Sequence, residues 1–194
     1  MILLNRLKYG LFLVFNKMII SLFVVSSFAI ADNQVKILML GDSLTQGYGL
    51  EEKSGLVPVL QRWLSSNETE VFLINGGVSG DTTLGGLERL DWLLTPDIDG
   101  VVVALGGNDL LRGFDPEFTK NNLDKIFMKL KSKGISAAVV GTISPLNYGS
   151  EFKKEFDDIF PALAEDYGLF YVDSFFAPLV CLLYTSDAAD EVLG

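Results

Sequence analysis

Short apolar stretches recur along the chain from residue 35 onward, separated by longer stretches with a different spacing. Five of them are rich in Val, Ile, Leu, Phe and Ala and show little alternation between apolar and polar positions. Such runs are typical of strands that are buried on both faces of a parallel sheet. We therefore predict five strands, at residues 35–40, 70–78, 100–107, 136–143 and 169–175.

The stretches between these strands carry apolar residues at helical spacing. One of them begins with Asp115 as a cap and Pro116 in its first turn, and it ends at Gly134. Another ends at Gly168 but contains Pro161, which we expect to kink or divide it. The predicted helical stretches cover residues 54–67, 82–94, 115–134 and 151–168.

The first two helical stretches each predict a buried face. The residues expected on it are Val59, Leu60, Trp63 and Leu64 in the first stretch, and Leu84, Leu87, Leu90 and Leu94 in the second. Strand and helix patterns alternate throughout, which predicts an α/β fold with a doubly wound parallel sheet and right-handed crossovers. The 194 residues are enough for one such domain and too few for two of ordinary size.

The first 31 residues have the pattern of a secretory signal peptide. Three basic residues precede an apolar run at residues 18–30, and small residues occupy Ala29 and Ala31. This pattern predicts cleavage after Ala31, a secreted or periplasmic protein, and no stable membrane insertion afterwards. The run is shorter than the roughly 20 residues that span a bilayer. Residues 11–30 taken together could still serve as an uncleaved anchor.

Composition narrows the classes of partner. Acidic residues outnumber basic ones by 25 to 15, which gives a formal net charge of −10. Nucleic acid is therefore not an expected partner, because phosphate binding requires a surplus of Lys and Arg. Hydrophobic residues make up 49% of the chain and charged residues 21%, as in folded domains. The single cysteine, Cys181, excludes an intramolecular disulfide.

Polar residues or glycines follow three of the predicted strands directly. Ser43 lies in LGDSLTQGYG, Gly80 in SGD and Asn108 in GGND. Because ligands bind at the carboxyl ends of the strands in such sheets, we expect these three loops to converge on one site. A serine at a strand-to-helix turn lies near free backbone N–H groups that stabilise negative charge. Gly80 could bring a bare N–H close to a reacting carbonyl, and the Asn108 amide could donate to an oxyanion.

Each of these residues also has an ordinary structural interpretation. Asp42 and Ser43 could merely cap the helix that follows them. Gly80 could be a turn glycine before a helix that Asp81 caps, and Asn108 could cap a loop.

A metal or phosphate site is a weaker interpretation of the same region. Asp42 and Asp109 could form a pair of carboxylates, but no further residues in the sequence complete a ligand set. The glycines after the first strand lack the Gly-Lys-Ser/Thr of a phosphate-binding loop. We therefore predict no metal and no organic cofactor.

Taken together, these segments resemble the SGNH (GDSL-type) hydrolases, a family named for a serine, glycine, asparagine and histidine in four blocks. Ser43 lies in GDSLTQGYG, Gly80 in NGGVSGDTTLGGLERL and Asn108 in LGGNDLLRGF, in the family's order and at its spacing. The resemblance extends from residue 35 to residue 176 and is greatest to the periplasmic acyl-CoA thioesterase I, lysophospholipase L1 and arylesterase group. It implies a three-layer sandwich with a five-stranded, flavodoxin-like parallel sheet.

The resemblance also implies roles for the candidate residues. Ser43 would be the nucleophile that forms an acyl-enzyme, and its N–H would form the oxyanion hole with the Gly80 N–H and the Asn108 side chain. Asp42 and Asp109 would support them. The residues that would line the acyl pocket are Leu111, Phe114 and Tyr148, although each could equally be a loop residue packed against the core.

The expected substrates are small acyl esters and thioesters, lysophospholipids included. One alternative is a carbohydrate O-acetylesterase of the same superfamily. Another is a non-catalytic binding module with the same fold.

The sequence contains no histidine, although the family places Asp-x-x-His after the fifth strand. Residues 181–191, CLLYTSDAADE, fit no part of the family pattern. They do match a frame-by-frame translation of the transposase adapter used in preparing sequencing libraries. We infer that the native sequence stops near Val180 and that residues 181–194 are a non-native tail. The SGNH domain would then span residues 32–180 and lack its last helix and its catalytic Asp and His.

This inference can be checked at the level of DNA. We expect the codons for residues 181–191 to be absent from an uninterrupted genomic read of the parent gene, with native sequence following codon 180 instead. Finding those codons flanked on both sides by native sequence would contradict it.

Overall fold

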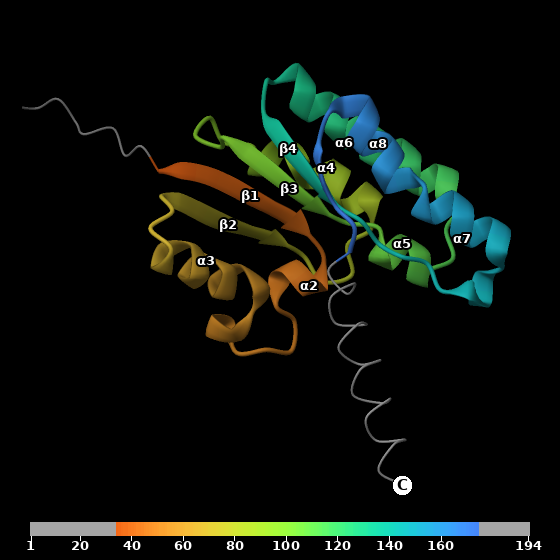
Figure 1. The fold of residues 1–194 in the computed structure, drawn as a ribbon, viewed down its shortest axis with the longest axis horizontal. Helices are drawn as coiled ribbons and strands as arrows, with labels where there is room; N and C mark the ends of the chain where they lie inside the picture. Colours follow the sequence, from red (N-terminus) through yellow and green to blue (C-terminus); the bar gives the residue numbers. More distant parts are fainter. Residues whose placement is uncertain (1–33, 175–194) are drawn as a thin grey trace, which may run out of the picture. The chain divides into compact units, whose positions relative to one another are not determined.

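The computed structural model describes residues 34–174, which form one parallel sheet with helices on both faces (Figure 1). The predicted signal segment and the predicted non-native tail lie outside the described residues. The strand order is β2-β1-β3-β4-β5, and every neighbouring pair is parallel. This is the flavodoxin-like order, so the predicted fold class is confirmed. The strands are β1 (Val35–Gly41), β2 (Val71–Gly77), β3 (Gly100–Ala104), β4 (Ser136–Val140) and β5 (Phe170–Val172).

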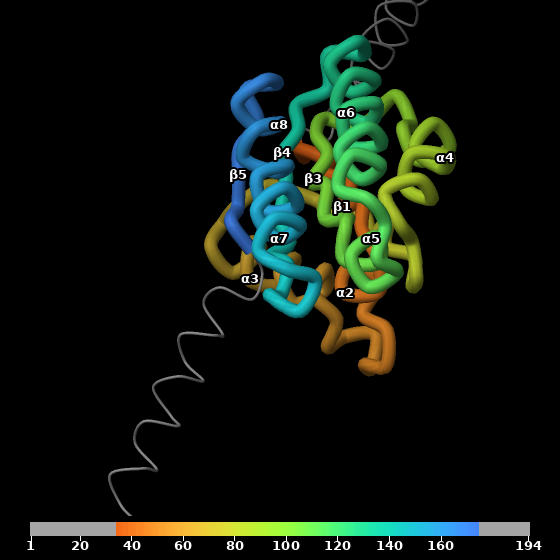
Figure 2. The backbone as a smooth tube through the Cα atoms, turned by 90° about the vertical axis from the view of Figure 1, so that its right-hand side faces the viewer, coloured from red at the N-terminus to blue at the C-terminus, as the bar shows by residue number. Residues whose placement is uncertain are grey.

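The helices divide into two unequal layers. The helix α3 (Leu56–Ser66) packs on one face, over a small cluster that includes Met39, Val57 and Leu73. The opposite face carries the larger core, and Figure 2 shows α6 between α4 and α8 on that side. The helices of this layer are α4 (Thr83–Leu93), α6 (Pro116–Ser132), α7 (Ser150–Asp157) and α8 (Ile159–Tyr167).

The predicted cap at Asp115 and the predicted break at Pro161 are confirmed, while α6 ends at Ser132, two residues before the predicted end at Gly134. The Asp115 side chain accepts a hydrogen bond of 2.8 Å from the N–H of Glu117, and Pro116 occupies the first turn of α6. The stretch around Pro161 is divided into α7 and α8, which meet at Asp158. Pro161 has no N–H to donate to the carbonyl of Asp157, four residues earlier, and α7 ends at Asp157 for this reason.

The predicted buried faces of the first two stretches are partly wrong. Val59 and Trp63 are 45% and 59% exposed, whereas Leu60 and Leu64 pack on the small cluster with Val57. Leu84 is likewise exposed, at 38%. Val59 and Trp63 are four residues apart, as are Leu60 and Leu64, so each pair lies along one side of the helix. Spacing alone therefore does not show which of the two sides faces the sheet.

Four aromatic rings form a continuous row, which we call the aromatic stack, from Tyr148 just before α7 into α8; the first two contacts are stacked and the last is edge-on. Successive ring centroids are 5.1 Å apart from Tyr148 to Phe152, 6.0 Å from Phe152 to Phe156 and 5.8 Å from Phe156 to Phe160. The innermost ring meets the backbone at Gly106, where an added Cβ would lie 3.1 Å from the Phe160 ring. The stack therefore connects an exposed loop with the turn that follows β3.

No helix within residues 34–174 is long and apolar enough to cross a bilayer.

The sheet core predicts a large cost for truncating a central side chain. Leu38 lies on β1, between β2 and β3, and is fully buried. We expect Leu38→Ala to lower the free energy of unfolding by about 2–5 kcal/mol, because the lost contacts leave a cavity. Leu146→Ala, at a position that is 69% exposed, is the control and should change it by less than about 0.5 kcal/mol in chemical denaturation. Equal effects of the two substitutions would contradict the observed packing.

Candidate active site

Three loops leave the sheet at the same level. In the register of the sheet, Gly41 at the end of β1 pairs with Gly77 of β2 and with Ala104 of β3, the last residues of those strands. The chain continues directly into α2 (Ser43–Gln46) after β1 and into α5 (Gly107–Leu111) after β3. Figure 1 shows both short helices at the arrowhead end of the strands. The predicted convergence of the loops on one edge is therefore what the structure shows.

Ser43 is the first residue of α2 and is half-buried. Asp42 caps this helix, because its Oδ1 accepts a hydrogen bond of 3.0 Å from the N–H of Leu44. The capping interpretation thus holds for Asp42 and not for Ser43. Within residues 34–174, neither the hydroxyl nor the N–H of Ser43 has a hydrogen-bond partner.

Glycines let α2 lie directly on the edge of the sheet. A Cβ at Gly41 would collide with the Thr45 side chain, and one at Gly77 would collide with the backbone of Gln46. Only glycine leaves room for this close approach. The strand-to-helix turn is therefore held at a fixed height above the strands.

Gly80 lies in the loop after β2 with a φ of +83°, a conformation that favours glycine. Its carbonyl accepts a hydrogen bond of 2.8 Å from Nη2 of Arg112. Its N–H donates to no group in the part of the chain that the structure describes. The cap of α4 is Thr82, whose Oγ1 accepts from Gly85, so the interpretation of Asp81 as that cap is wrong. The Asp81 carboxylate pairs instead with Arg89.

Asn108 connects the other two loops. Its Nδ2 donates to the Asp81 carbonyl at 2.9 Å and approaches Oδ2 of Asp42 at 3.4 Å. Asp42 precedes Ser43, and Asp81 follows Gly80. The structure thus brings together the neighbourhoods of all three residues that the resemblance singled out. Two backbone N–H groups there, those of Ser43 and Gly80, have no partner among the described residues.

Asp109 differs from Asp42 in its hydrogen-bond partners. It is completely buried and accepts hydrogen bonds from the N–H of Thr83 at 2.8 Å and from its hydroxyl at 2.5 Å. Asn122 donates to the same hydroxyl at 3.2 Å. Asp109 therefore ties the turn after β3 to α4 and α6. Among residues 34–174, no group of three or more Cys, Asp or Glu side chains is arranged to hold a metal ion.

The residues proposed to line an acyl pocket divide into two kinds. Leu111 is 77% exposed, and Tyr148, at 38%, lies next to Gly113 and stacks on Phe152. Phe114 is half-buried and packs edge-on against Phe118 of α6, with ring centroids 5.1 Å apart. Leu111 and Tyr148 are therefore available for contact, whereas the structure favours a packing role for Phe114.

Sequence reasoning missed two arginines that bind these loops, Arg89 and Arg112. Arg89 lies eight residues after Asp81, about two helical turns into α4, and that spacing is the signal that could have revealed the pair. The exposed Arg112 follows α5 directly, and nothing in its spacing indicates the Gly80 carbonyl as its partner.

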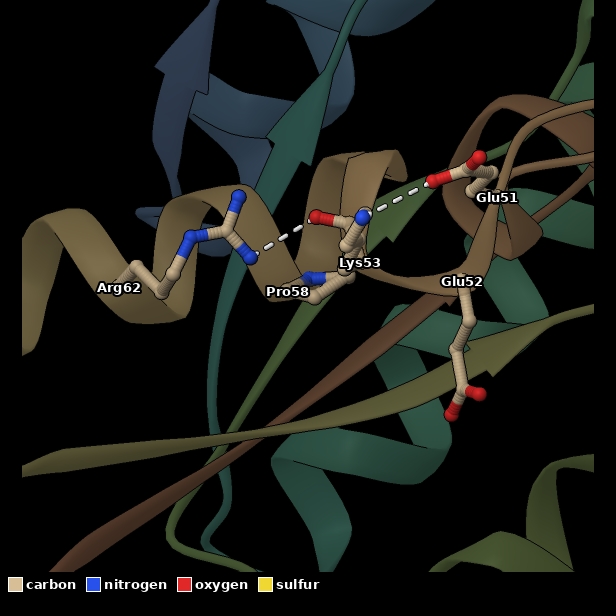
Figure 3. Close-up of a pocket in the computed structure, with 5 residues that line it drawn as sticks. All are labelled: Glu51, Glu52, Lys53, Pro58 and Arg62. Atoms are coloured by element: carbon tan, nitrogen blue, oxygen red, sulfur yellow. Dashed lines mark hydrogen bonds and ion pairs between the residues drawn. The ribbon is translucent and has the colours of Figure 1, made fainter.

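One hollow in the described surface is lined by none of these loop residues. It is lined by Glu51, Glu52, Lys53, Pro58 and Arg62 (Figure 3). The charged side chains that line it are exposed, and some of them contact other lining residues. Arg62 donates to the Lys53 carbonyl at 2.8 Å, and Lys53 forms an ion pair with Glu51 at 3.2 Å. Nothing in this arrangement indicates catalysis.

The burial of Asp42 affects its protonation. Desolvation raises the pKa of this carboxyl above its usual 3.8, and the hydrogen bond from Leu44 opposes the shift only in part. The nearby Asp81 and Asp109 carboxylates raise the pKa of Asp42 further. The charged form of Asp42 is thus less favourable in the folded chain than in the unfolded one.

This shift predicts a pH dependence of stability. Below pH 3.8 Asp42 is protonated in both states, and the cost of burying its charge develops as the pH rises through the folded-state pKa. We expect Asp42→Asn to become more stable relative to wild type as the pH rises through this range. The measurement is chemical denaturation at a series of pH values.

Asp97→Asn is the matched control with the opposite sign. The hydrogen bond from Lys36 lowers the pKa of Asp97 to about 2. The stability of wild type should therefore increase relative to that of Asp97→Asn as the pH rises from 2 to 4. If the stability difference between Asp42→Asn and wild type stayed constant, or shifted in favour of wild type as the pH rises, the burial argument would be refuted.

Comparison with known proteins gives consistent relatives. The sequence matches the GDSL-like lipase/acylhydrolase family over residues 39–190. It is 41% identical over 133 residues to an arylesterase of Vibrio mimicus, covering 67% of this chain and 66% of that protein. It is 35% identical over 133 residues to thioesterase 1/protease 1/lysophospholipase L1 of Escherichia coli, covering 68% of this chain and 62% of that protein. The matched segment thus spans slightly less than two thirds of the length of these curated relatives.

A solved structure agrees with the sequence relatives. The crystal structure of AlinE4, an SGNH-hydrolase family esterase, superposes with a TM-score of 0.72 at 36% identity, covering 84% of this chain and 98% of that one. The family match covers more than half of the chain, and the five-stranded parallel sheet agrees with the fold of this relative. The chain therefore belongs to the GDSL-like lipase/acylhydrolase family.

Proposed function

We propose that the parent protein is a serine hydrolase that cleaves small acyl esters and thioesters through an acyl-enzyme. The observation that carries this proposal is the Asn108 carboxamide, which joins the loop of Ser43 to the loop of Gly80. The names of the relatives, an arylesterase and a thioesterase/lysophospholipase, support the substrate class. We further propose, from the pattern of residues 1–31 alone, that the parent protein is exported.

In the proposed reaction the Ser43 oxygen attacks the acyl carbon, and the carbonyl oxygen becomes an oxyanion. The free N–H groups of Ser43 and Gly80 are two of its donors. The Asn108 amide has two hydrogens. One is committed to the Asp81 carbonyl at 2.9 Å, while the other makes only the long contact of 3.4 Å to Asp42 and is available to the oxyanion. Removing one such donor typically costs about 3 kcal/mol in the transition state.

The serine also needs a base, since a hydroxyl is a weak nucleophile at neutral pH. The family supplies a histidine for this step, and this sequence contains none. Loss of the base from a serine triad lowers the rate by about a millionfold and leaves about a thousandfold from the oxyanion hole and binding. We therefore propose that the 194-residue chain is almost inactive by itself.

The acyl chain would lie beside Leu111 and Tyr148. Both side chains are exposed, and they extend from the loops that follow β3 and β4. Burial of an alkyl chain against them would contribute roughly 25 cal/mol per Å² of apolar surface removed from water. This contact favours acyl groups longer than acetyl.

Chemical rescue tests the proposal on the chain as it exists. We expect the chain alone to hydrolyse p-nitrophenyl butyrate negligibly, and added imidazole to restore turnover by occupying the place of the missing base. The restored rate should saturate with ester and exceed the rate with imidazole alone. Ser43→Ala, measured at the same imidazole concentration, should abolish the excess, since the nucleophile is gone.

Two outcomes would count against the proposed function. Turnover that persists in Ser43→Ala would mean that Ser43 is not the nucleophile. An absence of rescue would likewise overturn the proposed function, and a native C-terminus that carries no histidine would then favour the non-catalytic binding module.

A further inference from the structure

Arg89 binds two of the three loops with one side chain. Its Nε donates to Oδ2 of Asp81 at 2.5 Å, and its Nη2 donates to the Gly41 carbonyl at 3.0 Å. The arginine and aspartate side chains are only 21% and 17% exposed. A charge-assisted hydrogen bond in such a site is screened less by water than one at the surface.

Both acceptors lie one or two residues from the groups that we propose to be catalytic. Gly41 ends β1 and is two residues from Ser43, and its carbonyl also accepts from the N–H of Val78 at 3.0 Å. Arg89 thus occupies the second acceptor position of this carbonyl.

Asp81 links the same arginine to the remaining site residues. It follows Gly80 directly, and its carbonyl accepts from the Asn108 amide. The Asp81 carboxylate therefore holds close to the end of β1 the segment that carries the Gly80 N–H and accepts from Asn108.

A guanidinium suits this task better than an ammonium. Its N–H groups are fixed in a planar fork, so that Nε and Nη2 reach two acceptors in different loops at once. Arg112 also contacts the second loop, through the Gly80 carbonyl, but it is exposed and makes one contact there. Of the two arginines, Arg89 is the one that constrains the first loop as well.

We propose that Arg89 is a positioning residue that sets the distance between the turn of Ser43 and the loop of Gly80 and Asp81. The placement of the loops is independent of the activity, whereas the consequence for catalysis rests on the proposed function. Arg89 does not touch the reacting atoms in this arrangement and acts through Gly41 and Asp81.

The first test measures loop placement without any reaction. The full chain, in a neutral detergent, is compared with Arg89→Met and Arg89→Lys by hydrogen–deuterium exchange. We expect Arg89→Met to speed exchange about tenfold in residues 41–46 and 77–83 while residues 116–132 and 159–167 keep their protection. Arg89→Lys should be intermediate, because one ammonium replaces only part of the fork.

Arg62→Met is the matched control. Arg62 also donates from its guanidinium to a backbone carbonyl, at 2.8 Å, but it lies on α3 at the exposed hollow of Figure 3. It should leave exchange in residues 41–46 and 77–83 unchanged.

The second test uses the imidazole-rescued reaction. We expect Arg89→Met to lower kcat by about tenfold to a hundredfold, because displaced donors stabilise the oxyanion poorly. KM should change by less than about threefold, since the acyl contacts are intact. Arg89→Lys should recover part of kcat, and Asp81→Asn should lower kcat in the same direction.

The outcomes separate the two proposals. If the wild type shows no Ser43-dependent turnover, the proposed function fails, and exchange alone decides the role of Arg89. Exchange that is unchanged in Arg89→Met, or raised equally throughout the described domain, would overturn the positioning role. A loss confined to KM, or no recovery in Arg89→Lys, would overturn it as well.

Discussion

The whole arrangement depends on the level at which three neighbouring strands end. Gly41, Gly77 and Ala104 are aligned in the sheet register, so the loops after β1, β2 and β3 start from one line. The hydrogen-bonded ladder of a parallel sheet fixes that line far more rigidly than side-chain contacts could. Glycine at two of the three positions lets α2 approach the strand ends without a collision. Groups far apart in the sequence thus start from neighbouring points on the sheet, and side chains such as Arg89 then connect the loops that carry them.

The two aspartates beside the site, Asp42 and Asp109, differ in how completely hydrogen bonds compensate their charges. Asp109 is buried with three nearby donors and anchors its turn to the helices behind the sheet. Asp42 faces the site, caps α2 and carries a raised pKa because its surroundings compensate its charge incompletely. A fully satisfied buried carboxylate stabilises a structure, whereas an incompletely satisfied one is found where function constrains the choice. The contrast supports the assignment of the Asp42 side as the reacting side.

Much of the fold followed from the sequence, because buried parallel strands and capped helices leave local patterns. The five strands, the cap at Asp115 and the break at Pro161 could all be inferred from neighbouring residues. The exposure of Val59 and Trp63 could not, since it depends on where α3 lies over the edge of the sheet. The convergence of the loops of Ser43, Gly80 and Asn108 followed from their positions after three strands, whereas the roles proposed for these residues came from a family resemblance. The contacts of Arg89 bridge residues 48 positions apart in sequence, and no local pattern encodes such a pair.

The aromatic stack connects the exposed loop at Tyr148 with the turn that follows β3. Its outer ring, Tyr148, lies at the rim where an acyl chain would lie, and its inner ring, Phe160, supports Gly106 two residues before Asn108. A smaller side chain at the rim removes a contact face from Phe152 and loosens the rings behind it. A substitution at Tyr148 therefore also affects, through the rings behind it, the turn that leads to Asn108, so the surface of one loop and the backbone of another are mechanically coupled.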